Sequence, residues 1–272
     1  MYTQANPDPG LFYARGYPPF LQLFQGWEKA TQAKVREEFG ERIDLIEQTL
    51  NADYAIGAYY MPMVFHENLV GFHPQRDILT SAYHRNLFAL YASFELTSRG
   101  LFGPARSVLR HVFESLIVAK FCALSSVPSV HTKWQQGQTI YFTNSVLNKI
   151  RNPSPTIFKE FWGIMSEFVH ASVYAQQMSF DWQHLHDNVP FTLDLILALI
   201  ECHYHILTSH IATPSVRYYT EYALRHTAHD NDFDIAQTRK AIRSLFSAAK
   251  KSTKPFFRRL IKDYKRTWIV DP

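Results

Sequence analysis

The chain has 272 residues, of which 46% are hydrophobic and 15% aromatic, and its net charge is +4 at pH 7. This composition is too apolar for a disordered chain, and the length allows one large domain or two small ones. The first residues, MYTQANPDPG, lack the basic start and apolar run of a signal peptide. The longest apolar stretch, around residues 193–200, contains Asp194, ends at Glu201, and is far shorter than the ~20 residues that a bilayer needs. We therefore expect a soluble, cytoplasmic protein without a transmembrane segment.

Charge and cysteines add two further expectations. From Arg239 to the end of the chain, Lys and Arg outnumber Asp and Glu by about nine, so the part before it carries about −5. The positive charge is therefore concentrated at the C-terminus. The two cysteines, Cys122 and Cys202, lie inside apolar helical patterns, which predicts buried thiols rather than a disulfide or redox pair.

The N-terminal half begins with an irregular segment and continues with helical periodicity. Residues 1–19 hold four prolines and two glycines, which predicts an irregular arm. A first helix is expected from residue 20 or 27 to residue 50, because Val, Phe and Ile recur at helical spacing there. Residues 53–74 are aromatic without a clear period, so we expect an ordered loop on the core. The period returns in residues 77–99, which predicts the next helix.

Residues 103–126 are apolar around nearly the whole circumference, which predicts one central helix packed on several sides. No stretch keeps a two-residue alternation, and the chain has only 10 glycines, so we expect an all-α multi-helix bundle of about nine helices. The expected organisation is an arm (1–19), a helical bundle core (20–232) and basic amphipathic C-terminal helices (233–272). Further helices are expected at residues 128–150, 155–169, 190–211, 214–226, 233–249 and 255–268.

Three charged residues lie along one face of the expected central helix. Arg106, Arg110 and Glu114 recur every fourth residue, about one per helical turn. Burying such groups on an apolar helix is costly unless each finds a partner elsewhere in the chain.

A candidate partner lies in the segment MSEFVHAS, where Ser166 and His170 are four residues apart at the end of an aromatic helix. If His170 pairs with Glu114 or Arg110, the cluster can tune pKa values in an apolar setting. Two plainer interpretations stay open. His170 can cap the C-terminus of its own helix, or the cluster can be a structural network that fixes the helix register.

The segments ARSVLRHVFE (Ala105 to Glu114) and MSEFVHAS (Met165 to Ser172) resemble the AxxxxRxxxE and (L/M)SxxxHxS motifs of an uncharacterised family of helical prokaryotic proteins. That family is similar to the HEPN superfamily of helical bundles. Many HEPN proteins are metal-independent ribonucleases or nucleotide-binding partners in toxin–antitoxin and phage-defence systems. The resemblance implies action on or through nucleic acid, a role in bacterial defence or stress response, and a homodimer with a composite site.

The HEPN ribonuclease motif is Arg, four to six residues, then His, usually with Asn or another polar residue after the Arg. Arg106 to His111 fits this spacing as RSVLRH, with Ser107 in place of Asn. On a regular helix the two side chains point about 140° apart, so one phosphate could meet both only if the helix ended there or a second subunit completed the site. The resemblance implies His as general base and Arg as stabiliser of the phosphorane. The candidate catalytic residues are Arg106, Arg110, His111, Glu114, Ser166 and His170.

The 13 histidines raise the question of a metal site. Glu167-x-x-His170 matches half of the carboxylate-bridged di-iron pattern, which requires two such motifs. His184/His186 and His203/His205 are spaced two apart, which points their rings away from each other on a helix. No Walker loop, dinucleotide fingerprint, HExxH or GxSxG motif is present. We therefore expect neither a metal nor a cofactor.

The last helices combine an apolar face with a basic one. The first interpretation is that the apolar face docks on the bundle and the charges are merely solvated. The second is a phosphate-binding surface for RNA or DNA, and the third is contact with an acidic protein or a membrane surface. The candidate nucleic-acid-binding residues are Arg239, Lys240, Arg243, Lys250, Lys251, Arg258, Arg259, Lys262, Lys265 and Arg266.

Two functions follow from these observations. The first is a HEPN-like helical protein that acts on or through nucleic acid, with metal-independent ribonuclease activity as its enzymatic form. The alternative is a non-enzymatic helical interaction or scaffold protein, whose Arg, Glu and His cluster is structural. The two functions predict different exposure of this cluster. Catalysis requires that the cluster open into a cleft, whereas a network that fixes the helix register is sealed in the core.

Overall fold

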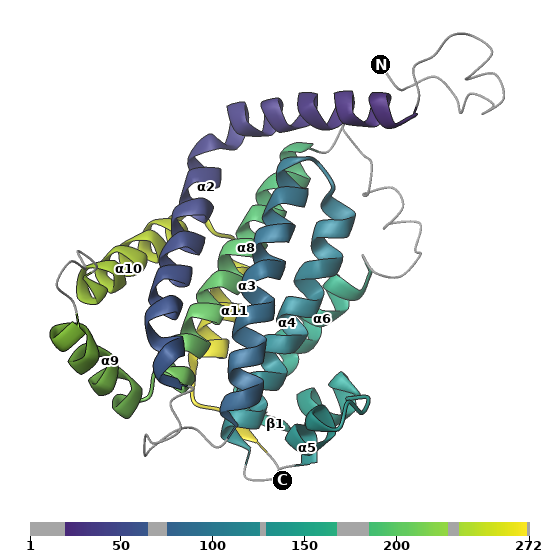
Figure 1. The fold of residues 1–272 in the computed structure, drawn as a ribbon. Helices are drawn as coiled ribbons and strands as arrows, with labels where there is room; N and C mark the ends of the chain where they lie inside the picture. Colours follow the sequence, from purple (N-terminus) through teal and green to yellow (C-terminus); the bar gives the residue numbers. More distant parts are fainter. Residues whose placement is uncertain (1–19, 65–74, 126–128, 168–184, 228–233, 271–272) are drawn as a thin grey trace.

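The computed structural model describes residues 20–64, 75–125, 129–167, 185–227 and 234–270. These residues form an almost entirely helical bundle, which confirms the predicted all-α fold class (Figure 1). The N-terminal arm and His170 lie outside the described residues. The helices are α2 (Phe20–Val64), α3 (Arg76–Ser98), α4 (Phe102–Leu124), α5 (Ser129–Gln135), α6 (Thr156–Glu167), α8 (Leu185–Ile206), α9 (Pro214–Thr227), α10 (Ile235–Ser252) and α11 (Pro255–Lys265).

Helix α2 is longer than the sequence pattern predicted. It contains a kink at Phe39 (φ −124°, ψ 19°), and Figure 1 shows the part before the kink crossing the end of the bundle. The expected loop at residues 53–74 is wrong for residues 53–64, which continue the helix. Asp53, Ile56, Tyr60 and Val64 are buried at helical spacing there. Tyr54 and Tyr59, which lie between them, obscured this period.

The predicted helix at residues 128–150 is also wrong beyond its first turns. Helix α5 ends at Gln135, and Gly137 adopts a left-handed conformation with φ +67°. A π-helical turn (Phe142–Val146) and a 3-10 turn (Leu147–Lys149) follow. The strand β1 (Ile150–Asn152) then pairs antiparallel with β2 (Ile269–Val270). This pairing joins residues more than a hundred positions apart, so no local pattern could predict it.

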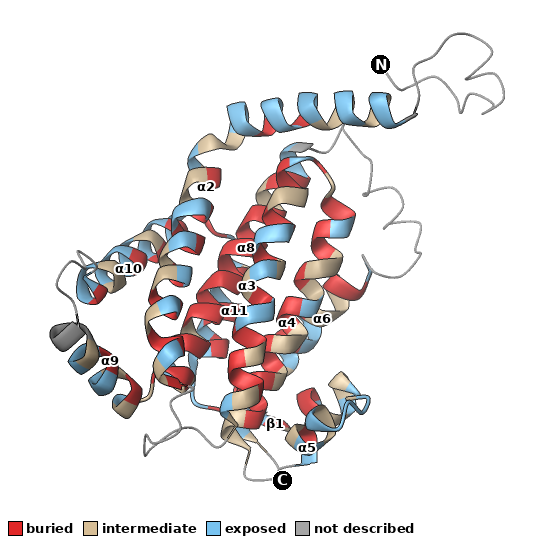
Figure 2. Ribbon diagram, in the orientation of Figure 1, coloured by how far each residue is buried: buried red, intermediate tan, exposed pale blue. Residues whose placement is uncertain are grey.

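The innermost helix of the bundle is α8 rather than the helix expected at residues 103–126, although that helix, α4, does pack on several sides, against α3, α6 and α8. Every residue from Thr192 to Tyr204 is buried, and α8 packs against α2, α3, α4, α10 and α11 (Figure 2). Helix α4 keeps an outward face, on which the His111 side chain is 73% exposed. The polar residues that broke the apolar pattern of α8 are all partnered. For example, Asp194 pairs with Arg42 at 2.8 Å.

Among the described residues, one helical stretch, His186–Ile211, is long and apolar enough to span a membrane by length and composition. In its most apolar window, 83% of the residues are buried inside the bundle. Such burial is typical of the core helix of a soluble protein. Cys122 and Cys202 are both free and buried, as predicted.

A buried polar network joins α2, α3 and α8. His203 places Nδ1 2.5 Å from Asp53 Oδ2 and Nε2 2.9 Å from the Tyr83 carbonyl, and its ring stacks on Tyr83 at 4.4 Å. The Tyr83 hydroxyl in turn donates to the Asp53 carbonyl oxygen at 2.9 Å. All three residues are buried, so this network has no access to substrate and instead fixes the relative positions of three helices. Gly57 is required beside it, because a Cβ atom there would lie 1.9 Å from the Tyr83 hydroxyl.

A buried lysine, Lys120, ties the C-terminal helix to the bundle. Its side chain is 1% exposed and donates to the backbone oxygens of Tyr264 and Arg266, the latter at 2.9 Å. The ammonium also lies 4.8 Å and 4.6 Å from the ring centroids of Tyr264 and Trp268. These contacts satisfy carbonyl groups at the end of α11 that have no partner within the helix. Burial lowers the pKa of Lys120 to about 7.

The apolar face of α11 packs in the same core. Phe257, Leu260, Ile261 and Tyr264 are buried, which confirms that this face docks on the bundle. The basic residues of α10 and α11 are therefore held in fixed positions relative to α8.

Candidate functional site

The arginine of the RSVLRH motif is sealed in the core. Arg106 is 1% exposed, and its guanidinium donates to Thr192 Oγ1 at 3.1 Å, to Asn188 Oδ1 at 2.8 Å and to the Asn188 carbonyl at 3.3 Å. Its guanidinium carbon also lies 4.9 Å from the centroid of the Phe191 ring. His111 lies on the outward face of the same helix. The structure thus does not bring Arg106 and His111 together within one subunit, as their helical spacing indicated.

The other charged residues of α4 meet α6 rather than α8. Arg110 donates from Nε to Glu114 Oε1 at 3.0 Å, and Trp162 Nε1 donates to the same oxygen at 2.7 Å. The Arg110 guanidinium lies 5.1 Å from the Trp162 ring centroid, and His111 Nδ1 is 3.9 Å from Glu114 Oε2. Ser166 donates to the Trp162 carbonyl. This group is half-buried at the bundle surface, and its expected partner, His170, lies outside the described residues.

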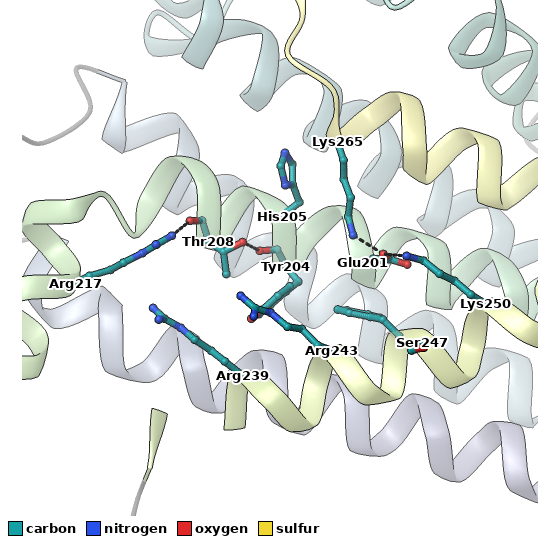
Figure 3. Close-up of a pocket in the computed structure, with 11 residues that line it drawn as sticks. Glu201, Tyr204, His205, Thr208, Arg217, Arg239, Arg243, Ser247, Lys250 and Lys265 are labelled. Carbon is teal, nitrogen blue, oxygen red and sulfur yellow. Dashed lines mark hydrogen bonds and ion pairs between the residues drawn. The ribbon is translucent and has the colours of Figure 1, made fainter. Parts of the chain in front are cut away.

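The strongest concentration of charge lies elsewhere, in a pocket of about 460 Å³ between α8, α9, α10 and α11. We call it the basic pocket. Figure 3 shows its side chains converging from these helices. It is lined by Glu201, Tyr204, His205, Thr208, Arg217, Arg239, Arg243, Phe246, Ser247, Lys250 and Lys265.

Helix α10 supplies three of the cations because of its spacing. Arg239, Arg243 and Lys250 are four and seven residues apart, which places them on one face of the helix. Ile242 and Ala249 are buried on the adjacent face, which fixes the rotation of α10 on the bundle. The helix begins at a regular cap, where the Asp234 side chain accepts hydrogen bonds from two backbone amides of the first turn.

The pocket carries five cationic side chains and one carboxylate. Glu201 pairs with Lys250 at 3.5 Å and also contacts Lys265. His205 adds no positive charge at neutral pH, because burial first and the nearby Lys120 second lower its pKa to about 3. Tyr204 stays protonated, since burial raises its pKa to about 12. The net charge of the lining is therefore strongly positive.

The three arginines of the pocket have no ion-pair partner among the described residues. Arg239 Nε and Nη2 and Arg217 Nε are buried and donate no hydrogen bond there, although Arg217 Nη2 donates to the Thr208 carbonyl. The Arg239 guanidinium lies 5.1 Å from the Tyr60 ring centroid, and burial followed by the proximity of Arg243 lowers its pKa. Unpaired buried donors cost about 1–3 kcal/mol each. An anion that accepts these hydrogen bonds is therefore favoured in the pocket.

The ten basic residues predicted to bind nucleic acid divide into two groups. Arg239, Arg243, Lys250 and Lys265 line the pocket, and the other six do not. Some of those six are engaged within the C-terminal helices, since Arg266 pairs with Asp263 at 3.1 Å. Arg217 was not predicted, because its helix carries no basic cluster. The α8 residues of the pocket were not predicted either, because a helical pattern does not reveal which elements meet.

The described residues contain no group of three or more His, Cys, Asp or Glu side chains that could hold a metal ion. Comparisons with known proteins add no assignment: no protein-family model, no curated protein and no solved structure matches this chain.

Proposed function

We propose that the protein binds nucleic acid, with backbone phosphate groups held in the basic pocket. The observation that carries this proposal is the set of three arginines that have no ion-pair partner in the part of the chain that the structure describes, two of which hold unpaired donors there. A guanidinium is suited to phosphate, because its planar array of donors matches two phosphate oxygens at once. Lys250 and Lys265, which share a single carboxylate, add positive charge at the same place.

The surroundings of the pocket favour phosphate over the other partners of a basic surface. Membrane binding by a basic amphipathic helix requires an apolar face that can enter the lipid, whereas that face of α11 is buried in the core. An acidic protein presents carboxylates on a broad surface, whereas a concave pocket of about 460 Å³ surrounds a compact anion.

Binding of a fluorescent single-stranded RNA oligonucleotide, measured by anisotropy over a range of salt concentrations, tests the proposal. Arg243→Gln is the informative variant, because Arg243 is exposed and lines the pocket, so the fold should tolerate the change. We expect weaker binding and a salt dependence reduced by about one phosphate contact. Lys240→Gln is the matched control, because Lys240 is exposed on the same helix but outside the pocket. Equal losses in both variants, or no salt-dependent binding by the wild type, would contradict the proposal.

Ribonuclease activity is a second candidate, favoured by one observation. His111 is exposed beside the Arg110 and Glu114 pair, where a histidine could act as a general base. Ribonuclease assays of the wild type, His111→Ala and His170→Ala test this candidate. Equal activity in all three proteins would refute it without affecting the phosphate-binding proposal.

A further inference from the structure

Helix α9 carries a cluster of exposed aromatic side chains. Tyr218, Tyr222 and Tyr219 are 63%, 52% and 39% exposed. The rings of Tyr218 and Tyr222 are stacked with centroids 6.4 Å apart and planes 23° apart, and the Tyr219 ring meets Tyr218 edge-on at 5.3 Å. Single exposed apolar residues are normal on protein surfaces, but three aromatic rings in mutual contact within five residues form a continuous aromatic patch. We call these three residues the tyrosine cluster.

The position of α9 places the tyrosine cluster next to the basic pocket. Val216 and Thr220 are buried and fix one face of α9 on the bundle, where the helix packs against α2. Arg217, on the flank of the helix, lines the pocket. Tyr218 follows Arg217 directly, with Cα atoms about 3.8 Å apart, and Tyr222 lies about 6 Å farther along the helix axis. The aromatic rings and the phosphate-binding arginine are therefore neighbours on one short helix.

We propose that the tyrosine cluster stacks the bases of a single-stranded nucleic acid whose phosphate is held in the basic pocket. This inference rests on the proposed function and names its substrate class. Proteins that bind single strands combine a positively charged groove for the backbone with aromatic side chains that stack on successive bases. In a duplex the bases are already stacked inside the helix and cannot lie on these rings. The surface thus selects a single strand over a duplex.

Charge distinguishes a nucleic-acid strand from a protein as the occupant of the tyrosine cluster. A protein partner that covered the tyrosines would also have to meet the cations beside them. A nucleic-acid strand can contact both the cations and the tyrosine rings, because each nucleotide carries one negative phosphate and one flat base.

The test compares a single-stranded oligonucleotide with a duplex of the same sequence, both fluorescently labelled. In the double variant Tyr218→Ala/Tyr222→Ala we expect a loss of about 5- to 150-fold in affinity for the single strand for each base that stacks. Affinity for the duplex should stay unchanged. The double variant Tyr218→Phe/Tyr222→Phe keeps the rings and should bind the single strand like the wild type. Tyr141→Ala is the control for removal of an exposed tyrosine elsewhere, since Tyr141 is 67% exposed outside α9.

The outcomes separate this inference from the function on which it rests. If the alanine variant binds the single strand as the wild type does while Arg243→Gln binds more weakly, the tyrosine cluster plays no part and phosphate binding stands. Equal affinity of the wild type for single strand and duplex also overturns the inference. If the alanine variant loses affinity for both probes alike, the tyrosines act on folding or on the pocket, and base stacking is refuted. If the wild type binds neither probe, the proposed function itself fails.

Discussion

Replacing Arg106 tests whether the arginine of the RSVLRH motif is structural. In Arg106→Met the volume of the side chain is roughly kept, but the donors to Asn188 and Thr192 are lost. A hydrogen bond from a charged donor contributes about 1.5–3 kcal/mol, and two strong ones are removed. Relief of the cost of burying the guanidinium offsets part of this loss. We therefore expect the free energy of unfolding to fall by about 2–4 kcal/mol.

The measurement is equilibrium unfolding in urea, followed by circular dichroism. His111→Ala is the matched control on the same helix, and its exposed side chain predicts a change within about 0.5 kcal/mol. The triple variant Arg106→Met/Asn188→Leu/Thr192→Val should recover part of the stability, because the two side-chain acceptors are removed together with their donor and only the Asn188 backbone carbonyl loses a partner. If Arg106→Met unfolds like the wild type yet loses activity on RNA, then Arg106 acts in a site and the structural explanation is wrong.

Two further predictions concern other buried groups. The pKa of Lys120 is about 7 in the folded chain and 10.5 in the unfolded chain, so the unfolded state binds more protons between these values. The free energy of unfolding should therefore rise with pH over this range by up to about 1.4 kcal/mol per pH unit. Urea unfolding at several pH values should show this rise in the wild type and not in Lys120→Met. An equal rise in both proteins would contradict the assignment. Gly57→Ala should lower the melting temperature and displace the Tyr83 ring from His203, because the new methyl group would overlap the Tyr83 hydroxyl. Gly26→Ala is its control, since a Cβ atom at Gly26 would meet no atom within 4 Å, and a similar melting temperature for both variants would refute the steric argument.

The candidate site shows why a pattern of charges along a sequence is ambiguous. Arg106 and Arg110 share one stripe of α4, yet Arg106 is enclosed by α8 and Arg110 lies against Trp162. The basic residues of α10 show the same ambiguity, because Arg239 and Lys240 are neighbours in the sequence but only Arg239 lines the pocket. Spacing determines which residues share a face of a helix, whereas packing decides which neighbour that face meets.

The sequence by itself determined the all-α class, most helix positions and the docking face of α11, because these depend on local propensity and on apolar spacing within one helix. Only the tertiary structure decided that α8 is the innermost helix, since its polar residues Asp194, Glu201 and His203 are balanced by partners far away in the chain. The basic pocket also depends on tertiary packing, because Arg217 and the cations of α10 and α11 meet only when three helices assemble around α8. Such long-range pairings leave no periodic signal in the sequence. Periodicity reports which residues share a face of one helix, whereas these pairings depend on which helices pack together.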